Sequence, residues 1–171
     1  MRKDLSKRTN WQKYASVGGS GREDIVNVIL HQHLMDDSDY KVIPKPRDLA
    51  HIYGKWGIIP ELGIRYMPTN KTAYIECKRQ GDNGNAHERM CRNLVPGILP
   101  LVSKIAGFYS PIFTVCMDGL AHNPKKRAEI IAWFDADGFR DRLLLWEDRK
   151  NYRTLIDWFN TNIRPYLEEG S

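Results

Sequence analysis

The stretch 56–80, WGIIPELGIRYMPTNKTAYIECKRQ, constrains the fold more than any other part of the sequence. Two runs rich in apolar, β-branched and aromatic residues flank MPTNK, in which Pro68 and Asn70 are typical turn residues. The stretch therefore predicts a β-hairpin. Residues two apart on a strand point to the same side of the sheet, so Glu76 and Lys78 are expected to share one face.

The remaining segments predict helices and strands around this hairpin. The first helix has capping-box spacing between Ser20 and Glu23, and a later helix begins at Asn123 and Pro124. Helices are expected over 20–35, 85–107, 123–134 and 151–169, with a short one before Gly54, and further strands over 110–119 and 142–148. This order predicts an α/β fold with a mixed β-sheet flanked by helices.

Length and composition are those of one compact domain, expected over residues 1–171, with residues 1–20 as a basic N-terminal arm. The chain has 26 Lys and Arg against 21 Asp and Glu, a net charge of +5 that suits a polyanion without requiring one. Three cysteines and the lack of a secretory signal favour reduced thiols in a cytosol. No apolar run is long enough to span a bilayer, so we expect an intracellular protein with no membrane partner.

The hairpin also predicts that two acidic side chains lie close together. If its strands pair around the turn, Glu61 sits beside Glu76, and two adjacent carboxylates repel each other unless a cation lies between them. Such oxygen ligands suit Mg²⁺, which can neutralise charge on a phosphate and acidify a water. Lys78 would add a positive charge for the transition state of phosphodiester cleavage. The E-x-K triplet alone favours an ordinary Glu/Lys pair on a surface strand, and the acid after Pro60 at hairpin distance adds weight to the metal site without deciding between them.

Three segments carry a family resemblance: PELGI, ECKRQ and GNAHERMCRNLVPGIL. With weaker similarity over roughly residues 9 to 146, the chain resembles the PD-(D/E)xK restriction endonucleases of the EcoRI and MunI type, and the MunI branch most. The resemblance implies a homodimeric type II restriction endonuclease that uses one or two Mg²⁺ ions per site. It further implies cleavage of double-stranded DNA at a short palindrome with an AATT core, leaving 5′-phosphate ends and 5′ overhangs.

The same resemblance assigns roles to individual residues. The implied catalytic residues are Glu61, Glu76, Lys78 and Glu23; the implied metal ligands are Glu61, Glu76 and the backbone carbonyl of Cys77. The implied base-reading residues are Asn85, Ala86, His87, Glu88, Arg89 and Arg92. Their chemistry agrees with this, because Asn pairs bidentately with adenine and Arg offers a donor fork to purine acceptors. The family's usual Asp is replaced here by Glu61, which is one methylene longer.

Several alternatives stay open at this stage. Glu23 can cap its helix through Ser20, and Asn85 with Glu88 also has capping spacing. His87 and Cys91 could join other cysteines in a zinc site, although the spacing matches no common zinc pattern. The alternative functions are a repair or junction nuclease and a catalytically impaired, sequence-specific DNA-binding protein. A restriction enzyme implies a cytoplasmic, prokaryotic setting and a separate DNA methyltransferase that is not part of a complex.

Overall fold

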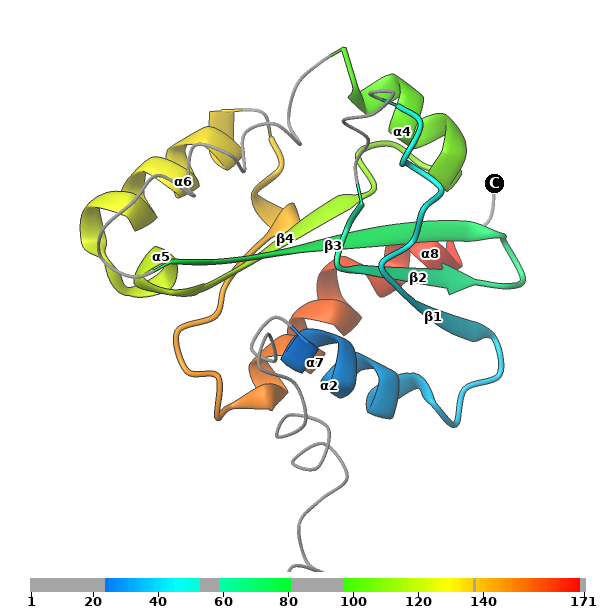
Figure 1. Cartoon of the computed structure of the whole chain (residues 1–171), viewed down its shortest axis with the longest axis horizontal. Coiled ribbons are helices and arrows are strands. Elements are labelled where there is room, and N and C mark those ends of the chain that lie inside the picture. Colours follow the sequence, from blue (N-terminus) through cyan, green and yellow to red (C-terminus); the bar gives the residue numbers. More distant parts are fainter. Residues whose placement is uncertain (1–23, 53–58, 81–96, 137, 170–171) are drawn as a thin grey trace, which may run out of the picture.

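The computed structural model describes residues 24–52, 59–80, 97–136 and 138–169. Within them, five strands form one sheet in the order β1-β2-β3-β4-β5, with helices on both faces (Figure 1). The strands are β1 (Tyr40–Pro44), β2 (Leu62–Tyr66), β3 (Lys71–Gln80), β4 (Ile112–Asp118) and β5 (Leu143–Leu145). The pairs β1/β2 and β2/β3 are antiparallel, and β3/β4 and β4/β5 are parallel. The predicted α/β fold with a mixed sheet is confirmed.

The central hairpin forms as its sequence predicts. Tyr66 pairs with Lys71, and residues 67–70 make the turn between β2 and β3. Asn70 has a φ of 56°, and the N–H of Asn70 donates to the carbonyl of Met67 at 3.3 Å. Asn tolerates this left-handed conformation better than most residues, so the turn fixes the strand register.

One face of the sheet packs against α2 (Asp24–Leu34), α7 (Tyr152–Asn162) and α8 (Arg164–Glu168), which Figure 1 shows on the same side. These helices bury apolar residues at helical spacing, namely Val26, Ile29, Leu30 and Leu34 on α2 and Leu155, Trp158 and Phe159 on α7. The sheet contributes alternate residues of its central strands, including Ile75, Cys77, Phe113 and Val115. Together they form one continuous hydrophobic core.

The opposite face carries α4 (Leu99–Ala106) and α6 (Pro124–Ala136), which lie over different ends of the sheet in Figure 1. A cluster under α4 contains Leu49, Tyr74, Val102 and Ile112. A second cluster under α6 contains Cys116, Ile130, Phe134 and Leu143. The short helix α5 (Gly119–His122) connects β4 to α6, and the 3-10 turn η4 (Arg140–Arg142) leads into β5. The hydrophobic packing on this face is therefore divided into two separate clusters, one under α4 and one under α6.

Local signals account for the ends of two helices. The side-chain oxygen of Asn123 accepts hydrogen bonds from the N–H groups of Lys125 and Lys126 at 3.1 and 3.2 Å, which caps α6 as predicted. Pro100 lies in the first turn of α4, where a missing N–H costs no helical hydrogen bond. Gly107 ends α4 with a φ of 85°.

Four segments differ from the sequence-based expectation. Strand β1 was not predicted, because it is short and ends at Pro44 on the edge of the sheet, where proline is tolerated. The final helix is divided at Ile163 into α7 and α8, with Pro165 in the first turn of α8. Strand β5 covers three of the residues expected over 142–148, and residues 48–52 form turns. None of the helices in the described ranges is long and apolar enough to cross a membrane.

Candidate active site

The base of the hairpin brings two acidic residues to neighbouring positions. Leu62 of β2 pairs with Ile75 of β3 at the end of the ladder, and extending this register by one step would place Glu61, just before β2, opposite Glu76. The backbone carbonyl of Glu61 accepts a hydrogen bond from the N–H of Lys45 at 3.0 Å, which ties this corner to the end of β1. Residues opposite each other in such a pair have Cβ atoms about 4.5–5.5 Å apart, a spacing that allows two carboxylates to share one cation.

Glu76 and Lys78 form an ion pair on β3. The Lys78 ammonium donates to Oε1 of Glu76, whose side chain is only 7% exposed, while Lys78 is partly exposed. A buried carboxylate remains charged only where partners compensate its lost hydration. The interpretation of E-x-K as a pair on a solvated strand is therefore wrong for Glu76.

The neighbouring strand β4 supplies two more side chains on this face. Glu76 is paired with Thr114 and Lys78 with Cys116 in the parallel register, and both β4 residues are fully buried. Burial raises the pKa of the Cys116 thiol, and the nearby Lys78 ammonium partly offsets this effect. The thiol is thus neutral near pH 7 and packs as a small apolar group. The hydroxyl of Thr114 has no hydrogen-bond partner among the described residues.

These polar residues lie between the two apolar clusters of their face. On β3 and β4, Tyr74 and Ile112 belong to the cluster under α4, and Cys116 belongs to the cluster under α6. The positions between them are polar. We call this region the polar gap, formed by Glu61, Glu76, Lys78 and Thr114. A reactive group there is held by rigid strands and bordered by apolar packing, which strengthens its electrostatic interactions.

An ionic network holds the end of β3 next to the polar gap. Asp118, the last residue of β4, lies 3.6 Å from the Arg79 guanidinium and 2.9 Å from that of Arg149. Asp118 has a φ of 55°, which is unusual for a residue other than glycine. It also borders a cavity of about 340 Å³ together with His122 and Asp148. The network fixes the strand end from which the chain continues into residues 81–96.

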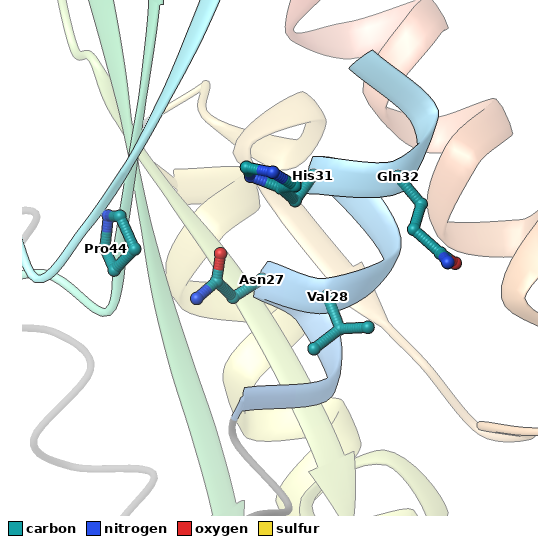
Figure 2. Close-up of a pocket in the computed structure, with 5 residues that line it drawn as sticks. All are labelled: Asn27, Val28, His31, Gln32 and Pro44. Atoms are coloured by element: carbon teal, nitrogen blue, oxygen red, sulfur yellow. The ribbon is translucent and has the colours of Figure 1, made fainter. Parts of the chain in front are cut away.

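A second pocket lies on the side of the sheet that α2 covers. It has a volume of about 280 Å³ and lies between α2 and the end of β1. Figure 2 shows Asn27 and His31 pointing towards the strand that carries Pro44. Val28 and Gln32 complete its lining. Because α2 covers the face opposite Glu76, this pocket is separate from the polar gap.

The donors that could hold a metal ion are few in the described part of the chain. No group of three or more His, Cys, Asp or Glu side chains gathers there in a way that could bind one. The polar gap instead offers the paired carboxylates of Glu61 and Glu76. The side chain of Cys77 packs in the core on the other face, so the ligand role that the family resemblance implies for Cys77 would fall on its backbone carbonyl. Two carboxylates and a carbonyl suit Mg²⁺, which keeps several waters as ligands.

The arrangement of an acidic pair and a lysine on a central hairpin can be compared with known proteins. A family model described as type II restriction enzyme MunI matches residues 53–168. The chain belongs to this family. The type II restriction enzyme MunI of Mycoplasma sp is 26% identical over 201 aligned residues, which cover 96% of this chain and 98% of the relative.

The MunI family also supplies a similar solved structure. The crystal structure of MunI restriction endonuclease in complex with cognate DNA matches with a TM-score of 0.75 and 26% sequence identity. The match covers 96% of this chain and 100% of the MunI chain. The predicted MunI-type fold and the predicted enzyme class, a type II site-specific deoxyribonuclease, are confirmed at the level of the family.

The predicted site residues divide into two groups in this MunI-family chain. Glu76 and Lys78 form an ion pair at the polar gap, and Glu61 lies next to Leu62, the residue of β2 that ends the ladder with β3. The other residues, Glu23 together with Asn85, Ala86, His87, Glu88, Arg89 and Arg92, lie outside the described residues. His87 and Cys91 of the alternative zinc site also lie outside them.

Sequence reasoning missed Thr114 and Asp118. The largely apolar run of the predicted strand 110–119 indicated a buried strand, but it did not show which strand lies beside it. Had β3 and β4 been aligned as parallel neighbours, Thr114 would have been found opposite Glu76. The aspartate at the end of a buried strand was the available signal for Asp118, because ligand and active sites gather at such strand ends.

Proposed function

We propose that the chain is a Mg²⁺-dependent endonuclease that, as a homodimer, cuts both strands of a short palindromic DNA site with an AATT core. Each subunit hydrolyses one phosphodiester, leaving 5′-phosphate and 3′-hydroxyl ends with 5′ overhangs. The observation that carries the proposal is the ion pair between the buried Glu76 and Lys78 on the central strand of a MunI-family fold.

The polar gap fits a divalent cation. Its donors are hard oxygen ligands, namely the Glu61 and Glu76 carboxylates and the Cys77 carbonyl, and the unpartnered Thr114 hydroxyl lies beside them. A bound Mg²⁺ would supply Lewis-acid chemistry, neutralising phosphate charge and making a water a better nucleophile. Glu23, which precedes α2, is proposed as a further acid near this site.

Lys78 is the group that acts on the phosphate. Its ammonium is partly exposed and can exchange Glu76 for a phosphate oxygen, where it stabilises the negative charge that grows on phosphorus-bound oxygens. Lys78 also orients the attacking water. In the hydrolysis, the water oxygen forms a bond to phosphorus, the bond from phosphorus to the 3′ oxygen breaks, and a proton passes to that leaving oxygen.

The proposed reading segment follows the cutting strand directly. Asn85, Ala86, His87, Glu88, Arg89 and Arg92 come within a few residues of the end of β3. Asn85 can pair with adenine, and Arg89 can donate to purine acceptors in the major groove. Arg79 is held by Asp118 at the end of β3, so the strand end that precedes this segment in the sequence is fixed relative to Lys78.

A two-fold homodimer suits a palindromic site, because each subunit then meets the same half-site. The helix α4, which follows the reading segment, exposes apolar side chains that support a second copy as partner. Leu101 is 51% exposed and Ile105 36%, and Tyr109 just beyond the helix is 60% exposed. A cytoplasmic, prokaryotic setting and a separate methyltransferase that protects the host DNA complete the proposal.

The test of this function is digestion of phage DNA by the purified full-length protein with and without Mg²⁺. We expect discrete fragments with Mg²⁺ and intact DNA with EDTA. Random degradation, or no cleavage with any divalent metal, would contradict site-specific hydrolysis. Arg89→Ala should bind and cut the site poorly while its thermal melting stays that of the parent.

One observation favours a second candidate, a DNA-binding protein with impaired turnover. Glu61 stands where the family resemblance expects an aspartate, and its longer side chain changes the reach of the carboxylate. This candidate predicts tight, specific DNA binding in the presence of metal and no product. If this candidate is correct, Glu61→Asp should cleave DNA that the parent does not cleave. The leading proposal expects Glu61→Asp to change only the cleavage rate, because the parent is already active.

A further inference from the structure

Thr114 is a buried polar residue without an evident structural role. Its side chain is fully buried in the middle of β4, and Oγ1 has no hydrogen-bond partner among the described residues. Burying a hydroxyl without a partner is unfavourable, so most buried hydroxyls in folded proteins are hydrogen-bonded. A valine would fill the same β-branched shape on a strand without that cost. The hydroxyl therefore calls for a functional explanation.

The sheet places this hydroxyl beside the Glu76 carboxylate. Thr114 is the direct partner of Glu76 in the parallel register, and neighbouring strands lie about 4.8 Å apart. Alternation puts both side chains on the face covered by α4 and α6, because Phe113 and Val115 point into the core on the other face. Thr114 thus projects into the polar gap.

The carboxylate has capacity for a second donor. One of its oxygens, Oε1, accepts the Lys78 ammonium. A carboxylate has two oxygens with about four lone-pair positions, so a metal ion and a hydroxyl can be accommodated together. A neutral donor leaves the negative charge that attracts the metal, whereas the Lys78 ammonium competes for that charge.

We propose that Thr114 is a positioning residue, whose hydroxyl donates a hydrogen bond to the Glu76 carboxylate when that carboxylate holds a divalent cation. The inference rests on the proposed function. The hydrogen bond fixes one orientation of the carboxylate and releases Lys78 to face the scissile phosphate. Partners of this kind, which hold a metal ligand without touching the metal, commonly change metal affinity or activity by about 10–100-fold.

Two substitutions separate the hydroxyl from the shape of the side chain. Thr114→Val removes the hydroxyl and keeps the branched shape, and Thr114→Ser keeps the hydroxyl and removes a methyl group. For each full-length variant we would measure Mn²⁺ binding by electron paramagnetic resonance, the Mg²⁺ concentration for half-maximal plasmid cleavage, and the melting temperature without metal.

The two substitutions are expected to have opposite effects on stability and on metal binding. Thr114→Val should melt at or above the parent temperature, because it loses an unpartnered buried hydroxyl, yet bind Mn²⁺ about 10–100-fold more weakly and need correspondingly more Mg²⁺. Thr114→Ser should melt lower, because it leaves a small cavity, and keep metal binding within about threefold of the parent. If Thr114 had a purely structural role, the less stable variant, Thr114→Ser, would also bind the metal more weakly. That is the opposite of the order expected here.

Thr72 offers a matched control on the same face. Its side chain is also buried, but its hydroxyl accepts a hydrogen bond from Nε of Arg65 at 2.9 Å, away from Glu76. Thr72→Val should lower the melting temperature and leave Mn²⁺ binding unchanged. Equal Mn²⁺ binding by Thr114→Val and the parent would overturn the role of Thr114 alone. A parent protein that binds no Mn²⁺ would overturn the proposed metal site and this inference with it.

Discussion

The two faces of the sheet use the same strands differently. On the side of α2, α7 and α8, residues from β2, β3 and β4 join one continuous apolar core, which contains Ile75 and Phe113. On the side of α4 and α6, apolar packing stops at the polar gap, where a buried carboxylate, a lysine and an unpartnered hydroxyl meet. Successive residues of β3 alternate between these surroundings, so one strand both stabilises the fold and holds the proposed site.

This difference predicts which substitutions should change stability and which should change activity. The core face gains from burying apolar surface, whereas the polar gap holds groups whose burial is unfavourable unless they are paired. Natural proteins accept such unfavourable groups chiefly at functional sites. Substitutions on the core face should therefore change the free energy of unfolding, and substitutions in the polar gap should change cleavage.

The largest effect is expected on the core face, at Phe113. Its ring is fully buried, lies 6.0 Å from that of Trp158 between centroids, and has the Arg142 guanidinium 4.8 Å from its centre. Phe113→Ala should lower the free energy of unfolding by about 3–5 kcal/mol. Urea denaturation measures this loss. Phe113→Leu, which keeps most of the volume, should cost far less, and equal losses in both variants would contradict tight packing on this face.

The next effect is expected in the polar gap, at Lys78. Lys78→Ala removes the cation proposed to stabilise transition-state charge, so cleavage should slow by about 10²–10³-fold or more. Single-turnover cleavage of a plasmid measures the rate, and filter binding measures DNA affinity, which should be retained. Near-parental cleavage by a folded Lys78→Ala protein would show that the polar gap is not the cutting site.

A smaller effect is expected at Asn123. This residue lies on the same face of the sheet as the polar gap but outside it, so it shows whether stability on that face can change without a change in cleavage. Asn123→Ala removes the cap of α6 and should lower the free energy of unfolding by about 1 kcal/mol. Thermal denaturation measures this loss. The cleavage rate of the folded protein should equal that of the parent, whereas Asn123→Asp should keep the cap and the stability.

The sequence predicted the hairpin and its acidic pair because the signals there are local. Pro68 and Asn70 mark the turn, the turn sets the register, and the register, extended by one step, would place Glu61 opposite Glu76. The cap of α6 was equally local. Strand β1 was missed because it is short and ends at a proline on the sheet edge.

The remaining parts of the site depend on contacts between distant segments. Thr114 neighbours Glu76 only because β3 and β4 run parallel, with α4 between them in the chain. The pairing of Asp118 with Arg149 likewise joins the end of β4 to the loop after β5. Composition and periodicity show that such strands are buried, but they do not show which residues face each other across the sheet.

The proposed function requires the polar gap to hydrolyse phosphodiesters at a defined DNA site. Sequencing the ends of a genome digested by the full-length protein with Mg²⁺, in parallel with Lys78→Ala, tests it most directly. We predict 5′-phosphate ends with overhangs at one palindromic sequence containing AATT, and no such ends from the variant. Ends scattered without a common sequence, or the same ends produced equally by Lys78→Ala, would contradict the claim.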